Sequence, residues 1–508
     1  MAKIREVDVL VIGGGVNGCG IARDLAGRGL SVVLCEKDDL ASATSSASTK
    51  LIHGGLRYLE QYEFNLVRHA LHEREVLLKS APHIIWPLTF ILPHHKKLRP
   101  WWMIRAGLFL YDHLGGRKIL SRSHSHYLPG TMYGQPLRPE FRRGFSYADC
   151  WVEDTRLVVL SARDAFEKGA EILTRTECVS IGKHAKQDIW QAVLQDVNTE
   201  EKHKIHARMV VNASGPWVAK TLGLVGADVG KYKIRWVKGS HIIVPKLYQG
   251  DHAYILQNDD KRIVFTIPYE KKYTLVGTTD IEYKDDIEEV RISIEEVDYL
   301  CAAVNRFFRH AVKPEDVEWT YSGVRPLVDD GDANASEVTR DYILEMDDVA
   351  GLPILSVYGG KITTFRKLGE QAGDLVTEKL GKGSKAWTET AHLPGGEGGI
   401  AGFETFVKTV RREYAWLPEN LAKRLGRAYG TRTRDILRGA KRITDLGEHL
   451  GESIYEAEIK YLVANEWAQT LEDILWRRSK LGLHTTEMTQ EKIRKLLKKL
   501  AGDKEEAA

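Results

Sequence analysis

The chain has 508 residues, more than one compact core normally holds, so we expect two or three structural units. Hydrophobic residues make up 43% and charged residues 28% of the chain, a balance that favours a folded protein over extended disorder. The formal net charge of only +3 argues against a nucleic-acid-binding protein, which needs a strongly basic face.

Five scattered cysteines give no Cys/His cluster at metal-ligand spacing, so we expect a reducing compartment and no metal site. The start of the chain shows no signal-peptide pattern. The apolar stretches fall far short of the roughly 18 to 20 residues that cross a bilayer. We therefore expect a cytoplasmic protein whose membrane contact would be peripheral.

The chain opens with a predicted strand at 7–12, a glycine turn, a helix over 19–29 and a second strand at 31–35. The turn places Gly13, Gly15 and Gly18 in the order G-x-G-x-x-G. Such glycines let backbone N–H groups at a helix N-terminus approach a pyrophosphate. Glu36 ends the second strand, where a carboxylate would accept hydrogen bonds from a ribose diol and repel the 2′-phosphate of NADP. Together these elements predict a Rossmann-like dinucleotide-binding unit.

Three later segments indicate that the bound dinucleotide is long and that its domain is discontinuous. Residues 42–58 combine a run of Ser and Thr with a lysine, a histidine, a Gly-Gly pair and an arginine. Residues 209–215 and 354–361 are apolar strands that end in small residues, as if the backbone passes close to a ligand. This spread favours FAD over NAD.

The strongest cluster of helix- and strand-breaking residues lies at 392–399, which contains one proline and four glycines. Beyond it the sequence is helix-like, with few strand signals and no catalytic constellation. We expect a separate helical domain there.

A long series of strings resembles the aerobic-type, FAD-dependent glycerol-3-phosphate dehydrogenases. Among them are VIGGGVNGCGIARDLAGRGL, SSASTKLIHGGLRYLE, NASGPWV, KGSHIIVP, WTYSGVRPL and YGGKITTFRKL. They follow the family order through most of 7–368, and EAEIKYLV and LWRRSKLGL fit in the C-terminal part. The resemblance implies a fold of the D-amino-acid-oxidase-like flavoprotein group, α/β in its Rossmann-like FAD-binding domain and α+β overall. An antiparallel-sheet substrate domain and a C-terminal helical domain complete it.

The resemblance also implies a reaction and partners. Glycerol 3-phosphate would be oxidised at C2 to dihydroxyacetone phosphate, hydride would pass to FAD, and electrons would reach membrane quinone in the respiratory chain. It is compatible with a homodimer and with a place on the inner face of the cell membrane.

On this basis the chain divides into six ranges. The FAD-binding domain takes 1–82, 141–230 and 319–385. The substrate part takes 83–140, with a candidate membrane-contact segment, and 231–318. The C-terminal helical domain takes 392–508.

The residues expected to bind FAD are the glycines and small or polar residues of the matching motifs. They are Gly13, Gly15, Val16, Asn17, Gly18, Glu36, Thr44, Ser45, Ser46, Ser48, Lys50, Leu51, His53, Gly54, Gly55, Cys178, Val179, Ala213, Ser214, Gly215, Trp217, Gly323, Gly360, Lys361, Ile362, Thr363 and Thr364.

A phosphomonoester carries about two negative charges at neutral pH, so its pocket needs fixed cations. Arg57, Arg325 and Lys361 lie in matching motifs next to turns and are the candidates. Three further residues are expected to orient the hydroxyl or the phosphate: Tyr58, Thr278 and Thr279.

Hydride loss from C2 requires a base for the hydroxyl proton. His53 is the first choice, although it would equally serve to position the flavin. Arg325 is expected to stabilise the developing alkoxide as well.

Residues 94–118 carry six Lys/Arg, two adjacent tryptophans and a short apolar stretch, the composition of an interfacial segment. A buried helix of the substrate domain would use the same residues. A second amphipathic segment, 491–500, is expected to pack on the C-terminal domain.

Two alternatives stay open. A glycerol-3-phosphate oxidase would share the flavin and substrate motifs but reduce oxygen to peroxide. A non-catalytic flavoprotein would retain FAD without turnover, a reading that the retained His53, Arg57, Arg325 and Lys361 disfavour.

Overall fold

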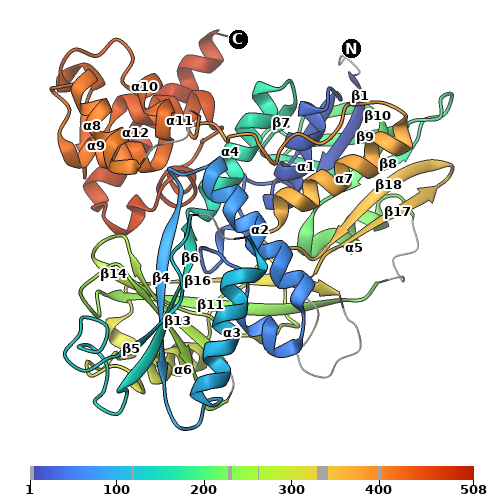
Figure 1. Ribbon diagram of the computed structural model, residues 1–508. Coiled ribbons are helices and arrows are strands. Elements are labelled where there is room, and N and C mark those ends of the chain that lie inside the picture. Colours follow the sequence, from blue (N-terminus) through green and yellow to red (C-terminus); the bar gives the residue numbers. More distant parts are fainter. Residues whose placement is uncertain are drawn as a thin grey trace.

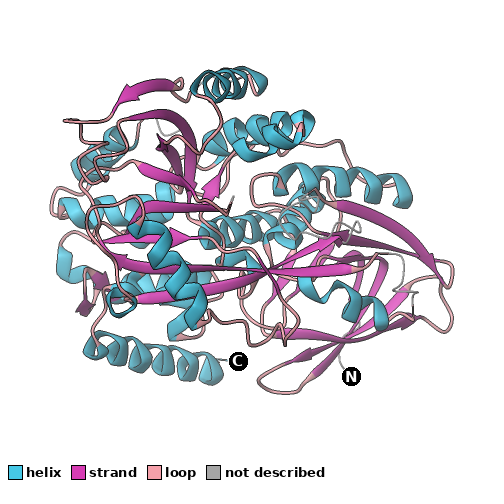
Figure 2. Cartoon of the chain, turned by 90° about the horizontal axis from the view of Figure 1, so that it is seen from below, coloured by secondary structure: helices cyan, strands magenta, loops and turns pink. Residues whose placement is uncertain are grey.

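The computed structural model describes residues 5–116, 119–226, 232–260, 262–328, 341–397 and 402–507. Figure 1 shows three parts: one sheet with its helices at upper right, a second sheet at lower left, and a helical part in orange and red at upper left. Helices flank the strands on both sides in the view from below (Figure 2).

The first sheet has a parallel centre in the order β18, β10, β1, β2, β7. Its other strands, β17, β9 and β8, add antiparallel pairs. The bounds are β1 Arg5–Ile12, β2 Val32–Cys35, β7 Glu171–Leu173, β8 Thr176–Lys183, β9 Trp190–Asp196, β10 Lys202–Asn212, β17 Ile343–Val349 and β18 Leu352–Tyr358.

Strand β1 is apolar at consecutive positions because both of its faces are covered. Val9 and Val11 face a core built with helices α1 (Val16–Gly27), α4 (Asp154–Glu167) and α7 (Phe365–Leu380). Leu10 and Ile12 face the opposite core, which contains residues of the β8–β9 hairpin and of α5 (Val218–Gly223). The predicted Rossmann-like unit is therefore present.

The second sheet runs β15-β11-β14-β13-β12-β4-β6-β3, with β16 on β11 and β5 on β6. Its pairs are antiparallel except β12 with β4. The bounds are β3 Leu51–Ile52, β4 Ile85–His94, β5 His124–Tyr127, β6 Arg143–Val152, β11 Ile234–Pro245, β12 Ala253–Gln257, β13 Ile263–Tyr269, β14 Tyr273–Gly277, β15 Ile281–Glu282 and β16 Trp319–Val328.

Helices cover both faces of this sheet. One face packs against α2 (Phe64–Ser80) and α3 (Trp101–Leu114), and the other packs against α6 (Ile294–Asn305). Helix α6 begins with a capping box between Ser293 and Glu296.

Two boundaries drawn from the sequence differ from the sheet pairing. Strands β6 and β16 lie in ranges assigned to the FAD-binding domain, yet they pair with β4 and β11 in the second sheet. Both pairings join segments far apart in the sequence, which local patterns do not reveal.

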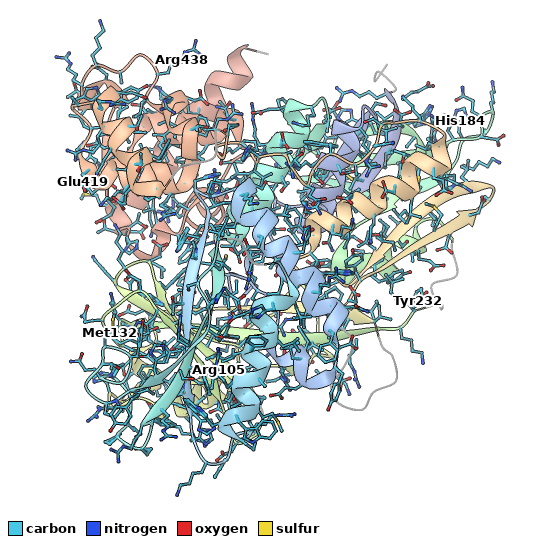
Figure 3. All side chains as sticks on the ribbon, viewed as in Figure 1. Arg105, Met132, His184, Tyr232, Glu419 and Arg438 are labelled. Atoms are coloured by element: carbon cyan, nitrogen blue, oxygen red, sulfur yellow. The ribbon has the colours of Figure 1, made fainter. Side chains whose placement is uncertain are left out.

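The C-terminal part is helical, as expected, and has its own core. Its helices are α8 Phe403–Glu413, α9 Glu419–Tyr429, α10 Thr433–Ile436, α11 Glu456–Asn465 and α12 Glu487–Ala507, with a small hairpin of β19 His449–Gly451 and β20 Ile454–Tyr455. The segment 491–500 packs on this core through Ile493, as predicted. Glu419 and Arg438 project from the outer side of this part (Figure 3). Residues 398–401 of the predicted boundary region lie outside the described residues.

No helix in the described ranges combines the length and the apolar character needed to cross a bilayer.

Candidate active site

A cavity of about 580 Å³ lies where the two sheets meet. The first sheet contributes the carboxyl ends of β1, β2, β10 and β18 and the turns that follow them. The second contributes residues of β11, β13 and β16 and the turn after β14. Ligands of open parallel sheets bind at this edge.

The glycine turn brings the N-terminus of α1 to the cavity wall. Gly13 has φ of +111°, and a Cβ there would lie 2.5 Å from the Ala213 carbonyl oxygen, so no other residue fits. Gly15 is the N-cap of α1 and has no side chain to cap the helix, and the first helical N–H, that of Val16, donates to Ser45 Oγ at 2.9 Å on the cavity wall. The positive end of the helix dipole therefore faces the cavity and suits a pyrophosphate.

Glu36 lies at one end of the cavity and is already oriented by backbone donors. Its Oε2 accepts a hydrogen bond from the Gly14 N–H at 2.7 Å, and its Oε1 accepts one from the Asp38 N–H at 2.9 Å. Burial raises the pKa of Glu36, although these donors act in the opposite direction. Trp217 also lines this end, with the Lys37 ammonium 4.8 Å from its ring centroid.

The other end collects the polar residues that the sequence predicted for substrate. Arg325 forms an ion pair with Asp280 and donates to Thr278 Oγ1 at 3.2 Å. The Lys361 ammonium lies 4.2 Å from the centroid of the Tyr58 ring. His53 lines the same cavity.

The lining fits FAD at several points. The cavity joins a carboxylate end to a cationic end and passes a helix N-terminus on the way. Glycines keep it open: a Cβ at Gly323 would lie 2.5 Å from Ala47, and one at Gly360 would lie 2.8 Å from the Asn17 side chain. FAD-binding residues predicted from the sequence line it: Gly13, Gly15, Val16, Asn17, Glu36, Thr44, Ser45, Ser48, Leu51, His53, Cys178, Val179, Ala213, Ser214, Gly215, Trp217, Gly323, Gly360, Lys361, Ile362 and Thr363.

Two predicted substrate residues do not line the cavity. Arg57 lies in the 3-10 turn of residues 56–61, and there adjacent side chains point about 120° apart, so Tyr58 faces the cavity and Arg57 does not. Thr279 is fully buried, donates to Glu296 at 2.8 Å and accepts from the Ser240 N–H. It holds the β14 turn to α6, whereas Thr278 lines the cavity.

Six residues predicted to bind FAD also lie behind the lining. Lys50 is buried against Asp154, with its Nζ 2.8 Å from the carboxylate. The other five residues are Gly18, Ser46, Gly54, Gly55 and Thr364. They shape the backbone behind the cavity: the glycines make close contacts, and Ser46 and Thr364 form hydrogen bonds to main-chain atoms.

The sequence reasoning missed several lining residues. Thr49 and Phe265 line the cavity, and Gly239 does so beside Arg325. Thr49 and Gly239 occur inside matching strings, but only the tertiary contacts single them out. Lys37, Asp38 and Glu177 add to the Glu36 end.

Fold and cavity together define a dinucleotide-binding protein in which the nucleotide lies on a parallel sheet and the cationic end borders a second sheet. Residues 8–366 match the model of the FAD dependent oxidoreductase family, and residues 386–505 match that of the C-terminal domain of alpha-glycerophosphate oxidase. The chain therefore belongs to the FAD-dependent oxidoreductase family.

Named relatives cover nearly the whole chain. A D-erythritol 1-phosphate dehydrogenase of Brucella abortus is 52% identical over 487 residues, which are 96% of this chain and 97% of the relative. A glycerol-3-phosphate dehydrogenase of Pseudomonas aeruginosa is 52% identical over 494 residues, 97% of this chain and 95% of the relative.

Among solved structures, the glycerol-3-phosphate dehydrogenase of Bacillus halodurans complexed with FAD superposes with a TM-score of 0.74 at 27% identity. The superposition covers 97% of this chain and 94% of that one. The expected family resemblance, fold class and FAD-dependent enzymatic nature are thereby confirmed.

Proposed function

We propose that this enzyme oxidises sn-glycerol 3-phosphate at C2 to dihydroxyacetone phosphate and passes the electrons to membrane quinone. The observation that carries the proposal is the cationic end of the cavity, where Arg325 and Lys361 lie with His53, Tyr58 and Thr278. The relatives named as glycerol-3-phosphate dehydrogenases support it.

Each residue at this end has a separate task. Arg325 and Lys361 bind the phosphate. Arg325 also offsets the negative charge that develops on the C2 oxygen. His53 takes the proton of the C2 hydroxyl, since a base must lie within hydrogen-bond reach of it. Bound FAD supplies the hydride acceptor.

A longer polyol phosphate is the second candidate substrate. D-erythritol 1-phosphate is the substrate named for a relative that is as similar as the glycerol-3-phosphate dehydrogenase, at 52% identity. Both compounds present a phosphomonoester and a secondary alcohol, so the same cations and base would serve either.

We place the membrane contact on α3. Trp102, Ala106, Phe109, Leu110 and His113 are exposed and fall on one helical stripe, with Trp102 67% and Phe109 58% exposed. The opposite face of α3 is buried through Leu108 and Tyr111. The helix thus combines both uses that the sequence left open, packing on the second sheet and presenting an apolar stripe.

The position of α3 suits electron delivery to a membrane. It packs near the 3-10 turn of residues 56–61, whose Tyr58 lines the cavity.

Arg105 of α3, labelled in Figure 3, donates a hydrogen bond to Ser123 Oγ at 2.7 Å. Residues 117–118 of the predicted segment lie outside the described residues.

Turnover assays test the proposed function. The purified enzyme is supplied with glycerol 3-phosphate or D-erythritol 1-phosphate, and with either a quinone analogue or oxygen as acceptor. We expect quinone reduction to be faster with glycerol 3-phosphate and peroxide to be a minor product. Stoichiometric peroxide formation would instead identify an oxidase, and a preference for D-erythritol 1-phosphate would reassign the substrate.

A further inference from the structure

A fully buried histidine, His241 of β11, lies directly behind the cavity wall. Its Nε2 is 3.0 Å from Thr49 Oγ1, and Thr49 lines the cavity. His241 itself is 0% exposed and does not line the cavity. It can act on a ligand only through Thr49.

The residues around the imidazole ring fix its position. The ring stacks on Tyr321, with centroids 4.7 Å apart and an interplanar angle of 18°. The Tyr321 hydroxyl donates to the Ser48 carbonyl at 2.9 Å, which ties the stack to the residue before Thr49. A Cβ at Gly277 would lie 2.1 Å from His241, so the glycine at 277 makes room for this ring.

The imidazole is neutral at working pH. Burial lowers the pKa of His241 well below its ordinary value, and the nearby charges of Arg325 and Lys50 lower it further. The ring also contacts Tyr321 and Thr49, and neither is an anion at neutral pH. A neutral imidazole has one N–H donor, on either Nδ1 or Nε2.

The hydrogen-bond partners of the two ring nitrogens indicate which of them carries the hydrogen. Nδ1 of His241 is buried and has no hydrogen-bond partner within the described ranges. An unpaired buried N–H is rarer and more costly than an unpaired acceptor. The hydrogen therefore lies on Nε2, which donates to Thr49 Oγ1, and the Thr49 hydroxyl must direct its own hydrogen elsewhere.

Thr49 is linked to both the start of α1 and the cationic end of the cavity. It follows the run Thr44–Ser48, of which Ser45 accepts a hydrogen bond from the Val16 N–H at the start of α1. His241 pairs with Gly277 across β11 and β14, and the next residue, Thr278, accepts a hydrogen bond from Arg325. On the proposed function, the carbon that gives up hydride lies between these two regions, which Thr49 joins.

We propose that His241 is a positioning residue that holds Thr49 as a hydrogen-bond donor to the oxygen on the reacting carbon of the substrate. The inference rests on the proposed function. A donor fixed in advance stabilises an oxygen whose negative charge grows in the transition state, so its loss slows the reaction more than it weakens binding.

Anaerobic stopped-flow measurement of flavin reduction by glycerol 3-phosphate tests the proposal. Thr49→Val should lower the limiting rate by about 10- to 100-fold while changing the half-saturation concentration by less than about threefold. Thr49→Ser, which keeps a hydroxyl, should retain most of the rate. Thr266→Val is the control, because Thr266 is a fully buried threonine of β13, in the sheet that contains His241, and does not line the cavity.

Variants of His241 distinguish a role in positioning Thr49 from a general effect of the substitution on folding. His241→Leu should slow reduction as Thr49→Val does, and the double variant should be no slower than either single one. His241→Gln, whose amide can still donate to Thr49, should restore much of the rate. Since His241 is neutral, the shape of the pH–rate profile should be the same in His241→Leu as in the native enzyme.

Additive losses in the double variant, or a normal rate in Thr49→Val, would overturn the proposal. So would the loss of an acid limb in His241→Leu, which would make the histidine a base. If His241→Leu fails to fold, the two Thr49 variants carry the test alone. Failure of the native enzyme to be reduced at all would instead contradict the proposed function, independently of Thr49.

Discussion

Glu36 and Arg325 occupy opposite ends of the cavity, and neighbouring residues hold each side chain in place. The Glu36 carboxylate accepts from the Gly14 and Asp38 N–H groups, while Arg325 contacts Asp280 and Thr278. Side chains fixed in this way lose little freedom on binding, which favours tight and specific recognition. The residues between them are mainly glycines and small polar groups.

Gly15 offers a clean test of the cofactor site. Its φ of −78° suits any residue, and a Cβ there would meet only Ser45 Oγ, at 3.3 Å. Gly15→Val should therefore fold normally but bind FAD poorly, because the side chain enters the pyrophosphate path. Flavin absorbance per protein and the thermal melting curve measure the two effects. A purified variant with a full complement of FAD would contradict this account.

Arg325→Ala should weaken substrate binding while FAD remains bound. A charged hydrogen bond contributes about 1.5 to 3 kcal/mol, which corresponds to a roughly 10- to 100-fold higher half-saturation concentration. The change also leaves the Asp280 carboxylate without this cation, which adds repulsion of a phosphate. Adding Asp280→Asn should recover part of the loss. Kinetics of Arg325→Ala that match the native enzyme would remove Arg325 from the phosphate site.

At the residue scale, the sequence indicates which residues reach the cavity only where a motif fixes the backbone. Gly13, Gly15 and Glu36 line the cavity because strand, turn and helix leave them no other place. Arg57 and Thr279 do not line the cavity, because the direction of a side chain in a turn depends on tertiary contacts. Thr49 and His241 are 192 residues apart in the chain, and only the tertiary fold brings them together.

At the scale of elements, β1 and α1 were predictable because the consecutive apolar residues 9–12, typical of a strand buried on both faces, lead directly into the glycine turn and the helix. The pairing of β6 with β4 and of β16 with β11 was not, because each joins distant segments. Helix α3 was ambiguous in sequence for a physical reason: one of its faces is buried and the other exposes Trp102 and Phe109.

The exposed stripe of α3 gives a prediction about membranes. Trp102→Ser combined with Phe109→Ser should reduce binding to vesicles of anionic phospholipid by at least about tenfold, because two aromatic side chains no longer enter the interface. Turnover with a water-miscible quinone analogue should be nearly unchanged. Sedimentation with vesicles measures the binding.

Met488→Ser is the matched control for these variants. Met488 is 71% exposed but belongs to α12 of the C-terminal part. If the α3 double variant and this control bind vesicles equally well, α3 is not the contact.

At the scale of the whole molecule, buried ion pairs join the C-terminal part to the FAD-binding sheet. Asp39, which follows β2, accepts from Arg477 at 2.6 Å and from Arg478 Nη2 at 2.8 Å. Arg156 of α4 donates to Glu466 at 2.9 Å. The sequence predicted a separate helical domain, but charged residues distant in the chain gave no sign that they would meet in a buried interface.

Removing one partner of this interface should be costly. Arg478→Met leaves the Asp39 carboxylate buried with less compensation, and such losses amount to about 3 to 5 kcal/mol. Urea unfolding should show a lower midpoint for the variant. Arg438→Met, a change on the outer surface, is the control and should leave the midpoint unchanged. Equal midpoints would show that the interface contributes little to stability.

Acid should weaken the same interface. Burial alone would raise the pKa of Asp473, but the Gln469 N–H, Arg477 and Arg175 lower it well below its ordinary value. Its stabilising effect is therefore complete above the pKa of the unfolded chain, about 3.9, and declines as pH falls towards the folded value. The stability difference between the native enzyme and Asp473→Asn should be large at pH 7 and smaller at pH 3. A difference that grows in acid would contradict the assigned direction.

The proposed reaction of this flavoenzyme is tested most directly by anaerobic titration of the FAD-loaded enzyme with glycerol 3-phosphate, followed by flavin absorbance. We predict that the oxidised flavin band disappears and that one dihydroxyacetone phosphate forms per flavin. A spectrum that stays oxidised at saturating glycerol 3-phosphate would contradict the assignment of the cationic end of the cavity to this substrate.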